Sequence, residues 1–294
     1  MDVRVFRYFH EVVKQGNITK AAKELHITQP TLSRQIMDLE EEVGKPLFFR
    51  GKRKVTLTDA GHIYHKRVEE MIRLLDRAQK EVQFSDDEVA GVLTIGCVET
   101  EAANFLMEQI ETFHHKFPLV QYEFYNGNSD DIKIRLDAGK LDFGILIEPV
   151  EAAKYDEFIL DIKERWGVLM PVGHSLSTFK ELSIDQVTDQ PMILPSRNIV
   201  MEELESWLGL AHGRLNLFAT HNLLSNTLPL VEKGLALCLV VEGAYTLRKN
   251  DGFIFRPLKP EKVSRHVVAW VKNREQSGLT NRFLSHLREK ITKL

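Results

Sequence analysis

The sequence predicts an α/β protein that begins with a small helical unit. Three observations support this expectation: two helices joined by a tight turn over 17–43, apolar residues at heptad spacing over 64–82, and alternating strand and helix patterns from 89 onward. Strands that alternate with helices are typical of a mostly parallel sheet with helices on both faces. With 294 residues, the chain is long enough for two or three domains with cores of their own.

The N-terminal segment has the start and stop signals of consecutive short helices. A helix from about Val3 to Lys14 is expected to end at Gly16, which has no Cβ to oppose the left-handed conformation of a helix C-terminus. Asn17 can cap the next helix, Ile18 to Leu25, by accepting a backbone N–H bond. After a short turn, Thr28 can cap a further helix in the same way.

The helix after the turn has an apolar and a polar face. Its apolar residues recur at spacings of four, three and four and are expected to face inward: Leu32, Ile36, Leu39 and Val43. The other face is led by short polar or cationic side chains and a proline: Thr28, Gln29, Pro30, Thr31, Ser33 and Arg34. In a major groove, Gln and Arg can pair with base edges and Ser or Thr with phosphate. A solvated helix in an ordinary helical domain is the alternative that this pattern leaves open.

A basic segment then lies between two short apolar pieces, Pro46 to Phe49 and Val55 to Leu57. Its cations surround a glycine: Arg50, Lys52, Arg53 and Lys54. Residues 1–60 hold 11 Lys or Arg against 8 Asp or Glu, whereas the whole chain has a net charge of -3. A hairpin with a cationic tip can lie along phosphates or enter a minor groove, so a wing is preferred here over a merely solvated turn.

Four of these segments match a known family pattern: Asn17 to Ile36, Leu39 to Gly44, Pro46 to Arg50 and Leu57 to Gly61. They resemble the N-terminal domain of LysR-type transcriptional regulators. The chain departs from that pattern at Asn17, where the family usually has Ser, and at Phe49, where it usually has Glu. The resemblance implies a winged helix-turn-helix domain over 1–58 that binds double-stranded promoter DNA.

A long helix is expected to begin at Thr58 or Asp59 and to run to about Phe84. Its apolar residues alternate spacings of four and three: Tyr64, Val68, Met71, Leu75, Ala78 and Val82. This is coiled-coil spacing, and such a helix has no core of its own to rest on, so we expect it to pair with a second copy. Packing on the C-terminal domain is the alternative. The segment 59–88 would then be a linker that ends in a polar hinge, Ser85 to Glu88.

The C-terminal part alternates strands and helices. The expected strands are Val92–Cys97, Val120–Tyr125, Phe143–Ile147, Gly167–Pro171, Met192–Pro195, Leu215–Ala219, Ala236–Val241 and Val267–Val271. The expected helices are Glu101–Lys116, Ser129–Ala138, Ile184–Val187, Met201–Leu210, Leu223–Lys233 and Asn281–Ile291.

This part carries weaker family landmarks: Leu93–Gly96, Phe117–Pro118, Gly139–Asp142, Gly173–Leu176 and Val231–Leu235. It resembles the two-lobed, periplasmic-binding-protein-like effector domain of the same family. The resemblance implies lobe I at about 89–162 and 266–294, and lobe II at about 163–265. The chain would cross between the lobes near Asp161 to Lys163 and near Lys262 to His266.

Ligands in open α/β sheets bind beyond the carboxyl ends of strands, where helix N-termini present free N–H groups. This rule selects eight polar residues as effector ligands: Glu99, Thr100, Asn128, Ser129, Ser196, Arg197, Thr220 and His221. Any one of them could be only a helix cap, so the prediction depends on their convergence on one cleft. Because a carboxylate leads the first helix, we expect an amphoteric or carboxylate effector, with an amine or hydroxyl toward Glu99 and an acceptor toward Arg197.

Other chemistry is not expected. The chain has no Gly-x-Ser-x-Gly, Walker or Gly-x-Gly-x-x-Gly motif, which disfavours the alternative of an α/β enzyme or solute-binding protein fused to a DNA-binding domain. No cofactor and no metal site is expected, since His62 and His65 are assigned to a solvated helix face. Cys97 is interpreted as a buried small hydrophobe rather than as a thiol sensor.

Composition agrees with a cytoplasmic protein. Hydrophobic residues make up 43% and charged residues 28%, and no apolar run approaches the ~20 residues of a membrane span. The charged start is unlike a signal peptide, and two distant cysteines give no disulfide framework. The expected partners are promoter DNA, a small-molecule effector and further copies of the chain, as a homodimer or homotetramer, with RNA polymerase as a candidate and no membrane.

Overall fold

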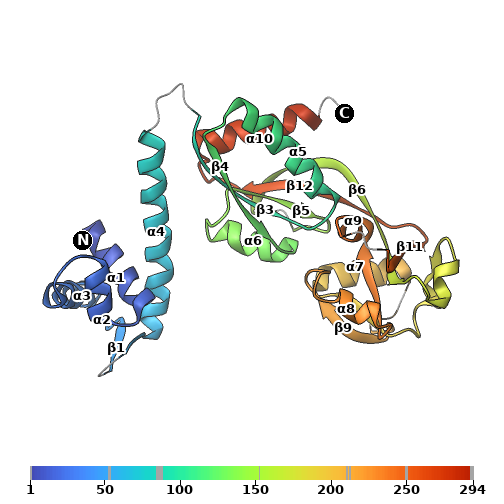
Figure 1. Ribbon diagram of the computed structural model, residues 1–294, viewed down its shortest axis with the longest axis horizontal. Helices are drawn as coiled ribbons and strands as arrows, with labels where there is room; N and C mark the ends of the chain where they lie inside the picture. The colour runs from blue at the N-terminus through green and yellow to red at the C-terminus, as the bar shows by residue number, and fades with distance from the viewer. Residues whose placement is uncertain are drawn as a thin grey trace. The chain divides into compact units, whose positions relative to one another are not determined.

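The computed structural model of the protein (Figure 1) describes residues 2–51, 54–83, 89–151, 153–209, 211, 213–248 and 251–291. The chain divides into two compact units, Met1–Asp87 and Glu88–Leu294. Within the described part of the chain, no helix is both long enough and apolar enough to cross a membrane.

The N-terminal unit begins with three helices, α1 (Val3–Gln15), α2 (Ile18–Glu24) and α3 (Gln29–Val43). The predicted caps are confirmed. The Asn17 side chain accepts the backbone N–H of Lys20 at 3.0 Å, and the Thr28 hydroxyl accepts that of Thr31 at 3.3 Å. The predicted inner row of α3 is buried at Leu32, Ile36 and Leu39 and packs with α1 and α2.

A hairpin follows, formed by β1 (Phe48–Arg50) and β2 (Val55–Leu57), with Phe49 opposite Thr56. The Glu40 side chain on α3 accepts the backbone N–H groups of Leu47 at 2.8 Å and Phe48 at 3.0 Å. This carboxylate ties the hairpin to α3, so the predicted winged helix-turn-helix is confirmed.

The long helix α4 (Asp59–Gln83) starts after Thr58, whose hydroxyl donates to the Pro46 carbonyl and accepts the Gly61 N–H. A glycine is required at this start, because a Cβ on Gly61 would lie 2.1 Å from the Leu47 carbonyl oxygen. The side chain of Val82 and the expected hinge over 85–88 lie outside the described residues.

The first half of α4 rests on the core of its own unit, so the expectation that this helix has no core was wrong. Val68 is fully buried, and Tyr64 and Met71 pack against the same cluster. The reason is α1, which places Phe9 against α4, with its ring centroid 5.5 Å from that of Tyr64. The first residues of the predicted heptad row therefore stabilise the monomer.

In lobe I of the C-terminal unit, parallel strands alternate with helices. The strands are β3 (Gly91–Cys97), β4 (Val120–Asn126) and β5 (Phe143–Ile147), and the helices are α5 (Glu101–Lys116), α6 (Ser129–Asp137) and α10 (Gly278–Ile291). Helices α5 and α10 cover one face of the sheet and α6 covers the other (Figure 1).

Lobe II has a second parallel set, β8 (Met192–Pro195), β9 (Leu217–His221) and β10 (Leu237–Val241). Its helices are α7 (Asn198–Leu208), α8 (Leu228–Glu232) and α9 (Glu242–Thr246), with 3-10 turns at Ser175–Thr178 and Ile184–Gln186. Strands β7 (Leu182–Ser183) and β11 (Phe253–Lys259) complete it. Helix α8 is shorter than the expected Leu223–Lys233, and α9 and β11 were not predicted.

Two antiparallel strands join the lobes, β6 (Tyr155–Pro171) and β12 (Val263–Val271). They place Lys163 opposite Arg265, and β6 continues into lobe II, where it pairs with β10 and β11. The main strand order is β4-β3-β5-β12-β6-β10-β8-β9. The sheet is thus mixed rather than mostly parallel, because the strands that cross between the lobes run against their neighbours.

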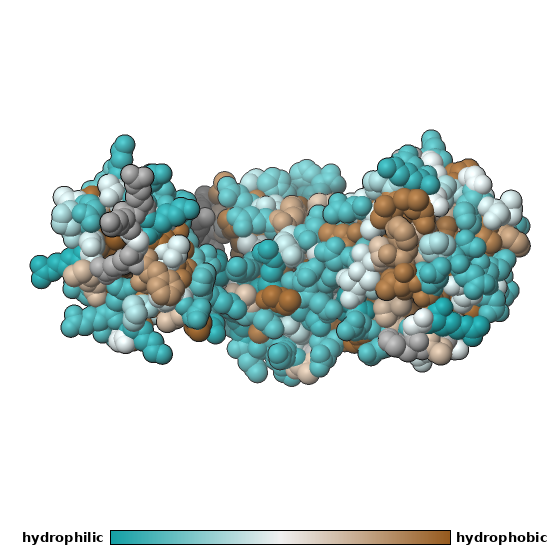
Figure 2. All heavy atoms as spheres, turned by 90° about the horizontal axis from the view of Figure 1, so that it is seen from below, coloured by the Kyte–Doolittle hydropathy of each residue, from teal (hydrophilic) through white to brown (hydrophobic). Residues whose placement is uncertain are grey.

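Hydrophobic side chains also gather on the surface of lobe II, at the right of Figure 2. Among the described residues of this lobe, the exposed large hydrophobic ones are Val172, Phe179, Ile199, Leu217, Phe218 and Leu235. Leu217 and Phe218 belong to β9, the last strand in the sheet order, so this sheet edge is apolar.

Candidate functional site

The polar face of α3 is open to solvent. Its exposed members are Thr28, Gln29, Pro30, Thr31 and Arg34, and Ser33 is half-buried. The Thr28 and Thr31 hydroxyls lie 2.8 Å apart, so the first turn of the helix is held together by its own side chains. The polar side chains outside the buried row present donors and acceptors to solvent, as direct reading of base edges requires.

The wing is described only in part. Lys54 is exposed, and its carbonyl accepts the Gly51 N–H at 3.0 Å. Of Arg50 only the backbone is described, and Lys52 and Arg53 lie outside the described residues.

The second candidate site is a cleft between the lobes of the C-terminal unit, with about 650 Å³ of empty space, open solvent at its mouth included. All the predicted effector residues except one line it: Glu99, Thr100, Asn128, Ser129, Ser196, Arg197 and His221. Thr220 is exposed and does not line the cleft, because side chains alternate along a strand and its neighbour His221 takes the inward position on β9.

The cleft also has an apolar wall that sequence reasoning missed. It includes Trp166 on β6, Val240 and Val241 on β10, and Ala244 on α9. The run ending at Val241 was predicted as a strand. The rule that ligands bind beyond the carboxyl ends of strands could therefore have identified Val240 and Val241 as part of this wall. Trp166 had no such signal, because it lies inside a strand that crosses between the lobes.

The Thr100 hydroxyl is positioned by a buried histidine. It lies 2.7 Å from Nε2 of His266, whose Nδ1 lies 3.0 Å from the Ile162 carbonyl. Since a carbonyl only accepts, Nδ1 carries the proton and Nε2 accepts from Thr100. Burial lowers the pKa of His266 to about 4, so the ring is neutral at pH 7. The Thr100 oxygen keeps lone pairs for a donor on a ligand.

His221 offers an acceptor of its own. Its Nε2 lies 3.2 Å from the Leu239 carbonyl and must therefore donate. Its Nδ1 is buried and has no hydrogen-bond partner among the described residues. Burial lowers the pKa of His221, which favours the neutral ring with a free acceptor at Nδ1.

The charged residues of the cleft are already paired. Glu99 forms an ion pair with Arg248, which follows α9, and it also accepts from Asn126 at 3.3 Å. The cation opposite Glu99 is therefore Arg248 and not Arg197. Arg248 takes this place because the end of α9 in lobe II faces the start of α5 in lobe I.

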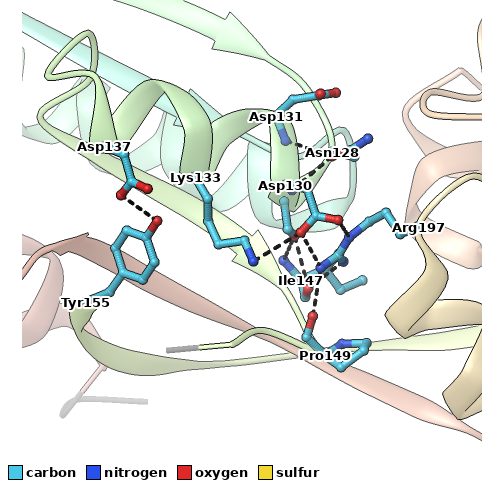
Figure 3. A network of polar contacts seen from close by, with 10 residues as sticks. Asn128, Asp130, Asp131, Lys133, Asp137, Ile147, Pro149, Tyr155 and Arg197 are labelled. Carbon is cyan, nitrogen blue, oxygen red and sulfur yellow. Dashed lines mark hydrogen bonds and ion pairs between the residues drawn. The ribbon is translucent and has the colours of Figure 1, made fainter. Parts of the chain in front are cut away.

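Arg197 is held by lobe I (Figure 3). Its Nε and Nη2 donate to the two oxygens of Asp130 at 3.0 and 3.2 Å, and Nη2 also donates to the Pro149 carbonyl at 2.9 Å. Lys133 lies 3.1 Å from the same carboxylate. Burial acts to raise the pKa of Asp130, but hydrogen bonds and charges from Arg197 and Lys133 outweigh it and lower this pKa. The guanidinium is therefore compensated before any ligand arrives.

The N-termini of α5, α6 and α9 are occupied as well, whereas α7 has no side-chain cap. Glu164 on β6 is 2% exposed and accepts the backbone N–H groups of Glu101 at 2.8 Å and Gly243 at 2.6 Å. Asn128 caps α6 by accepting the N–H groups of Asp130 and Asp131 (Figure 3). Protein oxygens thus hold positions that the sequence had left open for an anionic ligand.

Neither cysteine has the features of a reactive thiol. Cys97 and Cys238 are both buried, and burial raises the pKa of each thiol to about 12. The interpretation of Cys97 as a buried small hydrophobe is confirmed.

Comparison with known families gives two matches that together cover most of the chain. Residues 3–62 match the bacterial regulatory helix-turn-helix protein family of LysR type, and residues 86–292 match the LysR substrate binding domain.

Relatives match along the whole length. The Hca operon transcriptional activator HcaR of Escherichia coli (strain K12) is 30% identical over 99% of this chain and 98% of its own. The regulator BudR of Raoultella terrigena is 27% identical over 97% of this chain and 99% of its own.

Solved structures show the same fold. Full-length CbnR in complex with its target DNA has a TM-score of 0.79 and 20% identity, covering 98% of this chain and 99% of CbnR. Full-length BenM has a TM-score of 0.56 and 25% identity, covering 100% of this chain and 97% of BenM. The chain thus belongs to the LysR family of transcriptional regulators, with a helix-turn-helix DNA-binding domain and an effector-binding domain.

Proposed function

We propose that this protein controls promoters by reading operator DNA with α3 while its interlobe cleft binds a small molecule that changes promoter activity. The observation that carries the proposal is the set of exposed polar residues between Thr28 and Arg34, on a helix whose inner row, Leu32, Ile36 and Leu39, is buried. The wing and further copies of the chain, as a homodimer or homotetramer, would add phosphate contacts and a second half-site. Such a regulator acts in the cytoplasm, with RNA polymerase as a candidate partner.

The relatives support promoter DNA as the ligand. HcaR is described as an operon transcriptional activator, and CbnR has been solved with its target DNA. Both match this chain over nearly its whole length.

A catalytic role for the cleft has one observation in its favour, the hydrogen bond from Thr100 to His266. A hydroxyl beside an imidazole could serve as nucleophile and base. A general base works best with a pKa near the working pH, however, and the pKa of His266 is lowered to about 4. The ring is oriented by a neutral carbonyl rather than by a carboxylate. We therefore propose that the cleft binds its ligand without transforming it.

The pairing of charges guides the choice of effector. An amphoteric or carboxylate effector would have to break the Glu99–Arg248 or the Arg197–Asp130 pair to gain a charged contact. A neutral ligand can instead use Thr100 and His221 and place an apolar body against Trp166 and Val241. We propose an effector with an apolar body and uncharged hydrogen-bonding groups.

The operator role is tested by a gel shift with the DNA upstream of the protein's own gene. Arg34→Ala should weaken binding to this DNA by about tenfold or more and binding to random DNA far less, because bidentate base contacts contribute about 1 to 3 kcal/mol. Lys163→Ala, which removes an exposed cation from the C-terminal unit, is the matched control and should leave both affinities unchanged. Equal losses on both DNAs for Arg34→Ala would contradict base reading by α3.

A further inference from the structure

A cluster of metal-binding side chain types lies in the N-terminal unit, on α1 and α4 rather than on α3. Nδ1 of His10 lies 3.1 Å from Nε2 of His65, with the two rings nearly parallel at 8°. Glu69 follows His65 by one helical turn, and one potential ligand atom from each of the three residues lies within 4.8 Å of the others. All three side chains are half-buried.

Helix geometry and the packing of α1 on α4 bring these groups together. Residues four apart on a helix lie on one side of it, which places His65 and Glu69 together on α4. His10 comes from α1, next to the buried Phe9, whose ring centroid lies 5.9 Å from that of His65. The site therefore stands on two helices that the hydrophobic core already holds in contact.

A hydrogen bond between two neutral imidazoles explains this geometry only in part. It uses one proton and leaves the Glu69 carboxylate half-buried, with no hydrogen bond from any of the described residues. Two imidazole nitrogens and one carboxylate are a ligand set that suits zinc-like ions, with water in the remaining position.

We propose that His10, His65 and Glu69 bind a divalent transition-metal ion of the zinc class, which clamps α1 to α4. With zinc–ligand bonds of about 2.0 to 2.2 Å, ligand atoms of a tetrahedral site lie roughly 3.3 Å apart. The histidine nitrogens already have nearly this separation, at 3.1 Å. A ligand atom of Glu69 lies within 4.8 Å of one on each histidine, and the nearly parallel imidazole rings would turn so that both lone pairs point to the ion. Sequence reasoning had weighed His62 with His65 and missed His10, because its place beside His65 depends on the packing of helices far apart in the chain.

The test uses the full-length protein, first stripped of metal with a chelator and then titrated with zinc chloride. We expect one zinc ion per chain by equilibrium dialysis and a higher thermal midpoint of the N-terminal unit, because an ion that binds only the folded state stabilises it. His10→Gln and Glu69→Gln should each weaken zinc binding by at least about tenfold and abolish the thermal shift. Glu69→Gln keeps the size of a half-buried side chain, so it should fold normally.

The matched controls are His114→Gln and His115→Gln, which remove exposed histidines from α5 and should bind zinc like the wild type. Cobalt provides a second readout, since its visible absorption reports four-coordinate geometry and should be lost in the Glu69→Gln variant. The proposal is overturned if the wild type binds no stoichiometric zinc at micromolar concentrations. It is also overturned if His10→Gln and Glu69→Gln bind as tightly as the controls.

Discussion

Glu164 is the residue that argues most strongly against an anionic effector in the cleft. It lies on β6, where that strand passes from one lobe to the other, and its two oxygens receive backbone N–H groups from α5 and α9. Burial raises the pKa of this carboxyl group, while the two backbone hydrogen bonds act to lower it. The protein thus supplies its own acceptor at the positive end of α5, where an anionic effector would otherwise bind.

This arrangement leaves no room for a side chain at Gly243. A Cβ there would lie 2.0 Å from Oε1 of Glu164 and 2.6 Å from the Glu101 nitrogen. We expect Gly243→Ala to destabilise the C-terminal unit by about 1 to 3 kcal/mol, the usual cost of overpacking. The urea concentration at the unfolding midpoint should therefore be lower. Tryptophan fluorescence can follow this unfolding, because Trp166 lies on the same strand as Glu164.

Gly278→Ala is the matched control for that substitution. This glycine starts α10, and a Cβ added there meets no atom within 4 Å. Its midpoint should stay unchanged or rise slightly, since alanine reduces the conformational freedom of the unfolded chain. A Gly243→Ala midpoint equal to that of Gly278→Ala would mean that Glu164 can move aside at no cost.

At the scale of elements, α4 has two apolar faces. One packs on the core of its own unit through Tyr64, Val68 and Met71. The other is exposed and includes Ile63, 70% exposed, and Leu74, 59% exposed. These two residues lie within about 20° of each other around the helix, at 100° per residue. The exposed face is therefore the better candidate for pairing with a second copy.

Leu74→Lys tests this assignment. A lysine there would have to be desolvated against its symmetry mate, so we expect dimers to dissociate and operator affinity to fall although the DNA-facing residues are intact. Analytical ultracentrifugation would report the smaller species.

Ile134→Lys, at a residue that is 67% exposed on α6, makes the same chemical change elsewhere and should not alter the mass. Leu75→Lys separates the two faces, since Leu75 belongs to the heptad row predicted from the sequence. If Leu75→Lys dissociates the protein and Leu74→Lys does not, the pairing face is that row after all.

The elements that the sequence predicted best are those whose signals are local. The caps at Asn17 and Thr28 and the bounds of α5 followed from a few neighbouring residues. The first half of β6 was missed, because Tyr155 to Glu164 alternates buried and exposed residues irregularly and its partner β12 lies about 100 residues downstream. The burial of Val68 was missed for a similar reason, since it depends on α1.

At the scale of the whole C-terminal unit, paired charges hold the two lobes together across the cleft. Arg197 in lobe II binds Asp130 in lobe I, and Arg248 in lobe II binds Glu99 in lobe I. The sequence identified Glu99 and Arg197 as cleft residues because both follow strand ends. It could not identify their partners, since Glu99 and Arg248 are 149 positions apart. Only the fold shows that each of these two charges is already paired with an opposite charge from the other lobe.

The proposed preference for a neutral effector can be tested without knowing the effector. In a thermal-shift screen of small carboxylic acids and their matching amides, we expect the wild type to be stabilised by members of the amide series. Asp130→Asn should add stabilisation by the acids, because Arg197, 7% exposed, then lacks its carboxylate partner and a ligand carboxylate can replace it. The amides should shift the variant and the wild type alike.

Asp131→Asn removes the same charge from the next position of α6, where the side chain points away from Arg197 (Figure 3), and it should keep the wild-type ranking. If acids stabilise the wild type as strongly as they stabilise Asp130→Asn, the Arg197–Asp130 pair already opens for anions. The effector would then be a carboxylate, because a ligand that displaces Asp130 from Arg197 must itself provide an anionic group to the same guanidinium.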